Sequence, residues 1–277
     1  MPLLDEASRD LEPALSTDAR WAYFSRGADL DVAGGPPPTT EILRSEVLSG
    51  EQQTLLRGDR EVRQPVPSED GERLLFISRE QLNDAPGRRL YVMPTAGGEW
   101  QRLVPEDDEL LANYDVAVWR PNGDAVTYVR SQTADDGSVV SEIREVDVAS
   151  GAVQTLHRAP KDALIGGLSW TDDGSSLLFS ELTVSSAEDR DVTTFRWTAE
   201  TGRIFEVARN SVPAVVAHGE GFIGIGARPD AEGAVLFVWA KDGAEPIETA
   251  LRSDDGPIAS TTGPPALSPC LVGEEPR

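Results

Sequence analysis

Short apolar runs alternate with polar turn residues along almost the whole chain. In one such unit, residues 115–119 read DVAVW, an Asn-Gly turn follows at 122–123, and residues 125–129 read AVTYV. Two further runs follow, at 141–148 (SEIREVDV) and 152–156 (AVQTL). β-Branched and aromatic residues fill these runs, and no stretch of helix length has a 3.6-residue period. The pattern predicts four antiparallel strands per unit, joined by tight turns.

This unit recurs at a nearly fixed spacing. Asp-Gly-type turns are centred on Asp18, Asp70, Asn122 and Asp173, which lie 52, 52 and 51 residues apart, and a weaker copy covers residues 214–251. A period of this length makes each copy one supersecondary unit that buries its apolar face against its neighbours. We therefore predict an all-β fold, a β-propeller of four-stranded antiparallel blades. A ring is favoured over a linear β-solenoid because it removes the exposed edges of a linear stack.

The phase of the repeat also predicts the domain organisation. Residues 1–277 are expected to form one propeller domain. Its repeats are expected at about 10–60, 61–112, 113–162, 163–210 and 211–252, with a partial repeat or tail at 253–277. Fragments of the motif at both termini favour six blades, one of them incomplete, over five blades with a tail. In the six-blade arrangement, Leu3 and Leu4 add an outer strand and the region of Leu267 adds an inner strand.

Three of the turn segments carry a family resemblance. They are residues 65–78 (PVPSEDGERLLFIS), 117–123 (AVWRPNG) and 168–174 (LSWTDDG). These segments resemble the Trp-Ser-Pro-Asp-Gly repeats of TolB-like β-propellers, also called WD40-like or PD40 repeats, and the resemblance extends over residues 2–251. It implies the propeller fold. It leaves the function open, because oligogalacturonate lyases and the propeller portions of prolyl oligopeptidase-like peptidases carry similar repeats.

The composition restricts the partners of the protein. A net charge of −23, from 48 acidic and 25 basic residues, argues against nucleic acid and against anionic membranes, because both require clustered Lys and Arg. Lys161 and Lys241 are the only lysines, a bias typical of a GC-rich genome or a salt-adapted proteome. The chain has no apolar run of membrane-spanning length, and its first residues do not resemble a signal peptide. We expect a soluble, cytoplasmic monomer.

Few residues are candidates for chemistry. His157 and His218 are the only histidines, and the linear sequence places no nucleophile or orienting carboxylate beside either one. Acidic pairs such as 172–173 precede turn glycines and indicate hairpin turns rather than calcium loops. We therefore predict no catalytic residue, no metal and no cofactor. Trp119 and Trp170 occupy equivalent inner-strand positions, which indicates packing between blades, with ligand stacking as the alternative. These four histidine and tryptophan side chains are the candidate binding residues.

The connections between second and third strands are the remaining functional candidates. They are expected at 29–40, 81–88, 131–139 and 183–191, all on one face of the ring. Such loops often carry function because a rigid scaffold positions them. We predict a non-catalytic interaction scaffold that presents these loops to a protein or peptide. The alternative is a propeller enzyme, a carbohydrate lyase or hydrolase, with its site in the central funnel. A peptidase is disfavoured, because the sequence contains no α/β-hydrolase region.

Overall fold

The computed structural model describes ten stretches of the chain: 9–27, 40–58, 61–82, 85–104, 116–184, 190–209, 214–218, 221–227, 234–239 and 247–252. These residues form five four-stranded antiparallel sheets, each made of four strands that are consecutive in the sequence. No helix occurs among them.

The first three sheets use residues from Arg9 to Arg158. The first contains β1 (Arg9–Leu15), β2 (Trp21–Gly27), β3 (Thr40–Glu46) and β4 (Gln52–Arg57). The second contains β5 (Val62–Pro67), β6 (Arg73–Leu82), β7 (Ala85–Pro94) and β8 (Gln101–Arg102). The third contains β9 (Ala117–Trp119), β10 (Ala125–Thr133), β11 (Val139–Asp147) and β12 (Val153–Arg158).

Two further sheets follow in the same order. The fourth contains β13 (Ala163–Trp170), β14 (Ser176–Val184), β15 (Arg190–Thr198) and β16 (Ile204–Arg209). The fifth contains β17 (Ala214–His218), β18 (Gly221–Ala227), β19 (Ala234–Trp239) and β20 (Ile247–Arg252).

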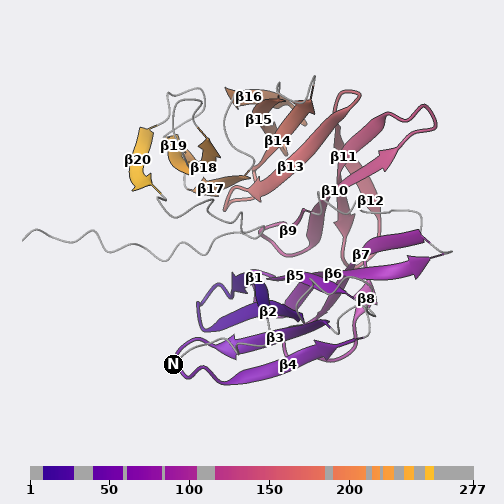
Figure 1. Cartoon of the computed structure of the whole chain (residues 1–277), viewed down its shortest axis with the longest axis vertical. Coiled ribbons are helices and arrows are strands. Elements are labelled where there is room, and N and C mark those ends of the chain that lie inside the picture. The colour runs from indigo at the N-terminus through magenta and orange to yellow at the C-terminus, as the bar shows by residue number, and fades with distance from the viewer. Residues whose placement is uncertain are drawn as a thin grey trace, which may run out of the picture.

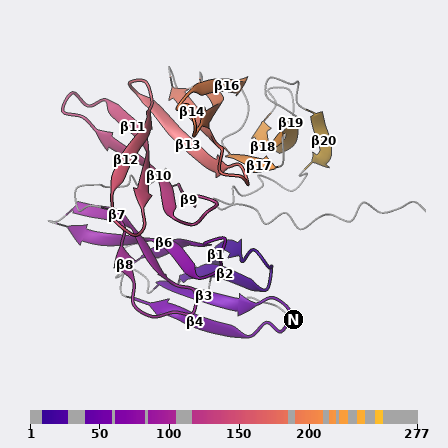
Figure 2. The ribbon, with the colours of Figure 1, turned by 180° about the vertical axis from the view of Figure 1, so that it is seen from behind.

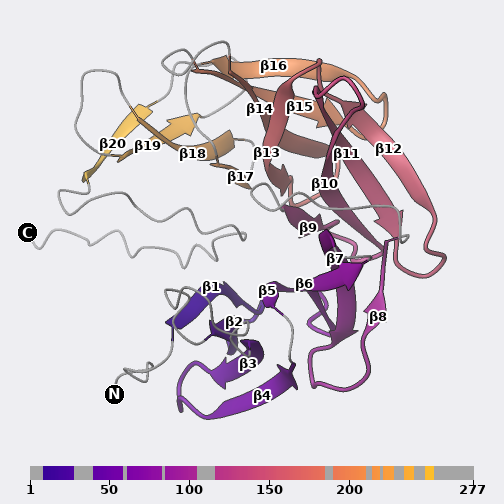
Figure 3. The same ribbon diagram turned by 45° about the vertical axis from the view of Figure 1, so that its right-hand side comes forward.

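The five sheets follow one another around an arc (Figure 1), and the view from behind shows the same succession (Figure 2). The first strand of each sheet lies on the inner side of the arc and the fourth on the outer side (Figure 3). This arrangement confirms the predicted β-propeller of four-stranded antiparallel blades. Leu3, Leu4 and Leu267, on which the sixth blade depends, lie outside the described residues.

Each turn is held by local hydrogen bonds, as the second sheet illustrates. The Ser68 hydroxyl donates to Asp70 Oδ1 at 2.5 Å and accepts a hydrogen bond from the Arg73 amide at 3.0 Å. The Glu72 amide donates to the same carboxylate oxygen at 2.9 Å. Gly71 has a φ of 71°, which lets the chain reverse at this point. These bonds hold the first and second strands of the blade in register.

The same hydrogen-bonded turn recurs in the first and fourth sheets. Ser16 with Asp18, and Thr171 with Asp173, make the corresponding hydroxyl–carboxylate bonds at 2.6 and 2.7 Å. The hydrogen bond from Thr171, together with the Ser175 amide, lowers the pKa of Asp173 to about 2. Ala19 adopts a φ of 54° where the other turns have glycine. The acidic turn residue therefore acts as a hydrogen-bond acceptor for the hairpin.

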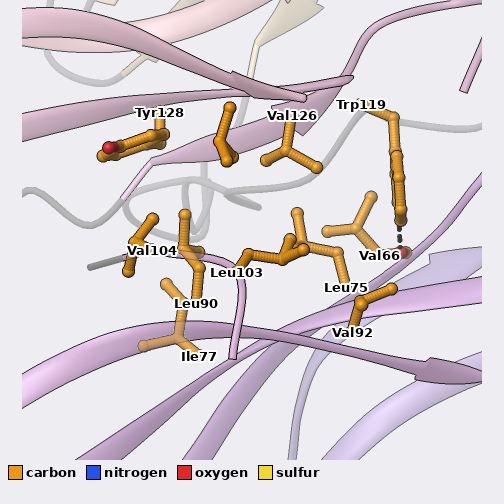
Figure 4. Packing of buried hydrophobic residues seen from close by; sticks show 11 residues of the cluster. Val66, Leu75, Ile77, Leu90, Val92, Leu103, Val104, Trp119, Val126 and Tyr128 are labelled. Carbon is orange, nitrogen blue, oxygen red and sulfur yellow. Dashed lines mark hydrogen bonds between the residues drawn. The ribbon is translucent and has the colours of Figure 1, made fainter. Parts of the chain in front are cut away.

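The core lies between adjacent sheets, as Figure 4 shows for the second and third. Its buried side chains come from both sheets: Val66, Leu75, Ile77, Leu90, Val92, Leu103, Val104, Trp119, Val126, Tyr128 and Val146. Comparable clusters join the first sheet to the second and the third to the fourth. Each sheet thus buries its apolar face against the next one, as the period of the repeat requires.

Three of the predicted loops are shorter than the sequence indicates. β10 continues to Thr133 and β11 begins at Val139, the β6–β7 hairpin pairs out to Leu82 and Ala85, and the β14–β15 hairpin pairs out to Val184 and Arg190. Polar residues occupy these positions, but a strand ladder is built from backbone groups and does not require apolar side chains. The hydroxyls of Ser131 and Ser141 lie 2.8 Å apart, so the buried polar groups of this extension satisfy one another.

Candidate functional site

Charged side chains gather on three neighbouring strands of the third sheet, β10, β11 and β12. Arg130 lies opposite Glu142 in the ladder, and Glu142 lies opposite Arg158. Along the same ladder, the pairs closer to the β9 hairpin are Val126 with Val146 and then Tyr128 with Arg144. Along this ladder, apolar pairs near β9 are therefore followed by charged residues. We call these four residues the Glu142 cluster: Arg130, Glu142, Arg144 and Arg158.

Glu142 is the centre of this cluster. Its side chain is 1% exposed, and the nearest Arg144 nitrogens lie 2.7 and 2.9 Å from its Oε2. Arg158 bonds to the other oxygen, Oε1, and an Arg130 nitrogen lies 3.7 Å from Oε2. Burial alone raises the pKa of this carboxyl, but the hydrogen bonds from Arg144 and Arg158 outweigh burial and lower the pKa below its ordinary value. Glu142 is therefore ionised and holds three guanidinium groups.

The arginines of the cluster differ in exposure. The Arg130 and Arg144 side chains are largely buried, and both make further contacts. The Arg158 side chain is 69% exposed although it bonds to a buried carboxylate. A guanidinium has five N–H donors in a fixed fork, so one bond to Glu142 does not use its full donor capacity. Arg158 is thus an anchored cation at the protein surface.

The first sheet contains a simpler version of this arrangement. Arg57 Nε lies 2.5 Å from Glu41 Oε1, and their ladder positions match those of Arg158 and Glu142. Arg26 lies opposite Glu41, as Arg130 lies opposite Glu142, and its guanidinium bonds to Gln52 at 3.3 Å and covers the Phe24 ring. The Arg57 side chain is 68% exposed, close to the value for Arg158. The third sheet differs in Arg144, which bonds to Glu142 from the ladder position that Leu43 occupies in the first sheet.

His157 joins the third sheet to the fourth. Its Nε2 lies 2.6 Å from Glu181 Oε1 on β14, and both side chains are mostly buried. The imidazole also packs against the Phe179 ring, with centroids 5.0 Å apart. In the β11–β12 ladder His157 lies opposite Ile143, a residue of the core between these sheets. No local sequence pattern indicates the carboxylate beside this histidine, because Glu181 comes from the next repeat.

The two candidate tryptophans also lie between sheets. Trp119 Nε1 donates to the Val66 carbonyl at 2.8 Å, a bond drawn in Figure 4, and Trp170 Nε1 donates to Thr127 Oγ1 at 3.1 Å. Both indoles are buried, and the Arg73 and Arg120 guanidinium groups cover their rings at 5.2 and 5.1 Å. Trp119 and Trp170 therefore make the same kind of contact. Each indole donates a hydrogen bond from an inner strand to a residue of the preceding sheet.

The fourth candidate, His218, is not brought near His157. It ends β17, the inner strand of the fifth sheet, whereas His157 lies on β12, the outer strand of the third. The position of its side chain is outside the described part of the structure. Across the ten described stretches, no group of three or more His, Cys, Asp or Glu side chains is arranged to hold a metal ion. Within the same stretches, no helix is long and apolar enough to cross a membrane.

The sequence pattern does not predict the Glu142 cluster. It predicts a strand over residues 141–148, but the alternation of polar and apolar residues does not distinguish a buried acidic residue from a solvated one. The only available signal was the placement of Glu142 and Arg144 two residues apart on one side of a strand that also carries Val146. Such spacing is common on exposed strand faces too, so burial of the carboxylate required the neighbouring sheet.

Comparison with known proteins identifies similar folds. No protein-family model matches this sequence, and no curated protein sequence is significantly similar to it. Similar solved structures include TolB from Acinetobacter baumannii, with 16% identity and a TM-score of 0.63 over 92% of this chain. An oligogalacturonate lyase in complex with manganese and the β-propeller domain of the Trilobed protease from Pyrococcus furiosus each have 14% identity and a TM-score of 0.62 over 91% of this chain.

These similarities concern the fold. The chain spans 57% of the length of the A. baumannii TolB, 67% of the lyase and 74% of the protease propeller domain. The structures support a propeller of the TolB-like type, as the turn motifs predicted. Because a fold of this kind is shared by TolB, a lyase and a domain of a protease, the likeness does not choose between a scaffold and an enzyme.

Proposed function

We propose that this protein is a non-catalytic β-propeller that binds another protein or a peptide as an interaction scaffold. The observation that carries the proposal is the display of aromatic side chains at the outer strands. Trp100, directly before β8, is 44% exposed, yet its ring packs edge-on against Tyr91 at 4.7 Å and Phe76 at 6.3 Å. Exposed tryptophans held in one orientation are frequent anchors of protein interfaces, because little side-chain entropy is lost on binding.

The fourth sheet displays apolar residues in the same way. Phe205 on β16 is also 44% exposed, and the Arg196 guanidinium lies 5.8 Å from its ring centroid. Trp100 and Phe205 both belong to the outer part of their blades, so a partner would approach the rim of the arc. The acidic composition further favours a partner with a basic contact surface. The cytoplasmic location and the monomeric state stay predictions and form part of this proposal.

Affinity capture followed by a binding measurement tests the scaffold. A protein captured by the wild type is purified, and its affinity is compared for the wild type, Trp100→Ala and Phe205→Ala. We expect Trp100→Ala to weaken binding at least about tenfold, equivalent to about 1.4 kcal/mol. Phe205→Ala tests the second member of the rim, and Leu48→Ala is the control, since Leu48 is an exposed apolar residue in the turn between β3 and β4. Unchanged affinity in both Trp100→Ala and Phe205→Ala would contradict the role of the aromatic rim.

One observation favours the second candidate, a propeller carbohydrate lyase or hydrolase. An imidazole oriented by a carboxylate is the arrangement of a general base, and His157 has Glu181 at 2.6 Å. Against it, His157 lies on an outer strand, Glu181 lies on a second strand, and the pair is between packed sheets, whereas a funnel site would use inner strands. Assays with oligogalacturonate and other oligosaccharides, run on the wild type and His157→Gln, decide the matter. Turnover that is lost in His157→Gln would replace the scaffold proposal.

A further inference from the structure

We propose that Asn122 is a site of spontaneous modification, at which the side-chain amide is lost and an acidic residue is formed. Asn122 lies in the turn between β9 and β10, at the position that Asp18, Asp70 and Asp173 occupy in the corresponding turns. The sequence contains four asparagines, and only Asn122 precedes a glycine. The modification goes beyond the scaffold function, because it needs no partner and changes one turn of the third sheet.

The Asn122 side chain is accessible to water, and the next residue can supply a nucleophile. Asn122 is exposed to solvent. Gly123 has no side chain to hinder the approach of its backbone nitrogen to Asn122 Cγ, and its conformational freedom lets the main chain rotate for the attack. In the folded turn the Gly123 N–H donates to the Arg120 carbonyl at 2.7 Å. This hydrogen bond has to open before the nitrogen reacts.

Two contacts of the Asn122 amide favour the loss of ammonia. The Asp124 backbone N–H donates to Asn122 Oδ1 at 3.1 Å, and negative charge develops on this oxygen when a nucleophile adds to Cγ. Asn122 Nδ2 donates to Asp124 Oδ2 at 3.0 Å, so a carboxylate that can transfer a proton lies beside the leaving nitrogen. Asp124 therefore contacts the reacting amide through both its backbone and its side chain.

The reaction requires only water as a co-reactant. The Gly123 nitrogen forms a bond to Asn122 Cγ, and the bond between Cγ and Nδ2 breaks. The proton lost by the Gly123 nitrogen passes through the Asp124 carboxylate to the departing nitrogen, which leaves as ammonia. Water then opens the cyclic imide at one of its two carbonyl carbons. Opening at Cγ gives aspartate, and opening at the main-chain carbon gives isoaspartate.

The two products have different effects on the turn. Aspartate provides the carboxylate that the other three turns carry, but it replaces the hydrogen bond between Asn122 and Asp124 by two carboxylates at close range. Isoaspartate adds an atom to the main chain between residues 122 and 123. The strands on either side are joined by the bond from the Arg120 amide to the Ala125 carbonyl. We expect isoaspartate to weaken the pairing of β9 with β10 more than aspartate does.

The test incubates the full, folded chain in mildly alkaline buffer. Released ammonia is measured, and mass spectrometry of proteolytic fragments locates aspartate and isoaspartate. We expect Asn122 to be converted before the other asparagines, with both products formed. Asp124→Asn keeps a hydrogen-bond acceptor beside Nδ2 without the carboxylate and should slow the conversion several times. Asn122→Asp is the matched control for one product, and the melting temperature of incubated wild type should fall below that of this variant as isoaspartate accumulates.

Three results would overturn the inference. If Asn122 is converted in urea but stays intact in the folded chain, the hydrogen bond to Arg120 protects the turn and the site does not exist in the native protein. Equal rates in the wild type and in Asp124→Asn would remove the carboxylate from the reaction. Faster conversion of any other asparagine would place the modification elsewhere. Circular dichroism checks that Asp124→Asn is folded, and the comparison with urea needs no variant.

Discussion

Replacement of Trp119 by phenylalanine tests whether the inter-sheet hydrogen bond stabilises the propeller. In the wild type the indole Nε1 donates to the Val66 carbonyl at 2.8 Å, and both residues are buried in the core between the second and third sheets. Phenylalanine keeps an aromatic ring at this position but has no donor. The bond connects two inner strands that belong to different repeats, so its loss weakens the interface between blades and leaves the hairpins themselves unchanged.

Three contributions determine how much Trp119→Phe should lower the free energy of unfolding. Leaving the buried Val66 carbonyl without this donor costs about 1–3 kcal/mol. The smaller ring leaves a void that adds about 1 kcal/mol. The Arg73 guanidinium, 5.2 Å from the ring centroid, loses part of a cation–π contact that contributes about 0.5 kcal/mol. These costs overlap, and we expect Trp119→Phe to lower the free energy of unfolding by about 2–4 kcal/mol.

Urea unfolding, followed by far-UV circular dichroism, measures the effect. The matched control is Trp100→Phe, which changes the same residue type at a half-exposed position and should cost less than about 1 kcal/mol. Equal slopes of the unfolding transitions are required, because a changed slope indicates an intermediate or an altered denatured state. If Trp119→Phe stays within about 0.5 kcal/mol of the wild type, or matches the control, the hydrogen bond does not stabilise the interface.

Three further predictions concern the turns and the charged cluster. Gly123→Ala forces a side chain into a φ of 73° and should lower the free energy of unfolding by about 1–2 kcal/mol in urea, whereas Gly166→Ala, which has open space and no positive φ, should be neutral. Glu142→Gln leaves its guanidinium groups without a buried carboxylate and should cost about 3–5 kcal/mol, clearly more than Glu41→Gln; equal costs would refute the central role of Glu142. The pKa of Asp173, about 2 against an ordinary 3.8, adds stability above pH 3.8 that is lost as the pH falls through about 2. Melting temperatures between pH 4 and 2 should therefore fall more steeply for the wild type than for Asp173→Asn, and parallel curves would contradict this.

The turn motif explains why so much of the fold could be predicted. The hydroxyl–carboxylate bonds of Ser68 and Thr171 involve residues two apart in the sequence, so the interactions that fix each hairpin are local. Equal spacing of such turns, with apolar runs between them, then dictates sheets of equal size that stack on one another. The exception was the length of the strands, because backbone pairing continued through polar residues such as Ser131.

The contacts of the candidate residues could not be predicted from local sequence patterns. His157 was identified as a candidate, but its partner Glu181 lies 24 positions further along, on another sheet. Trp170 was expected to pack between blades or to stack on a ligand, and its bond to Thr127 spans 43 positions. No local pattern relates residues at these separations, since they meet only after two complete sheets have packed together.

The sequence by itself determined the all-β class, the four-stranded unit and the turns, because each depends on side-chain alternation and on hydrogen bonds within a few residues. Only the tertiary structure decided which charges are buried and which are displayed. Glu142 is buried and pairs with Arg130 and Arg158, which come from the neighbouring strands β10 and β12. The electrostatic character of each site is set by neighbours across strands and sheets, and the linear order of residues does not specify them.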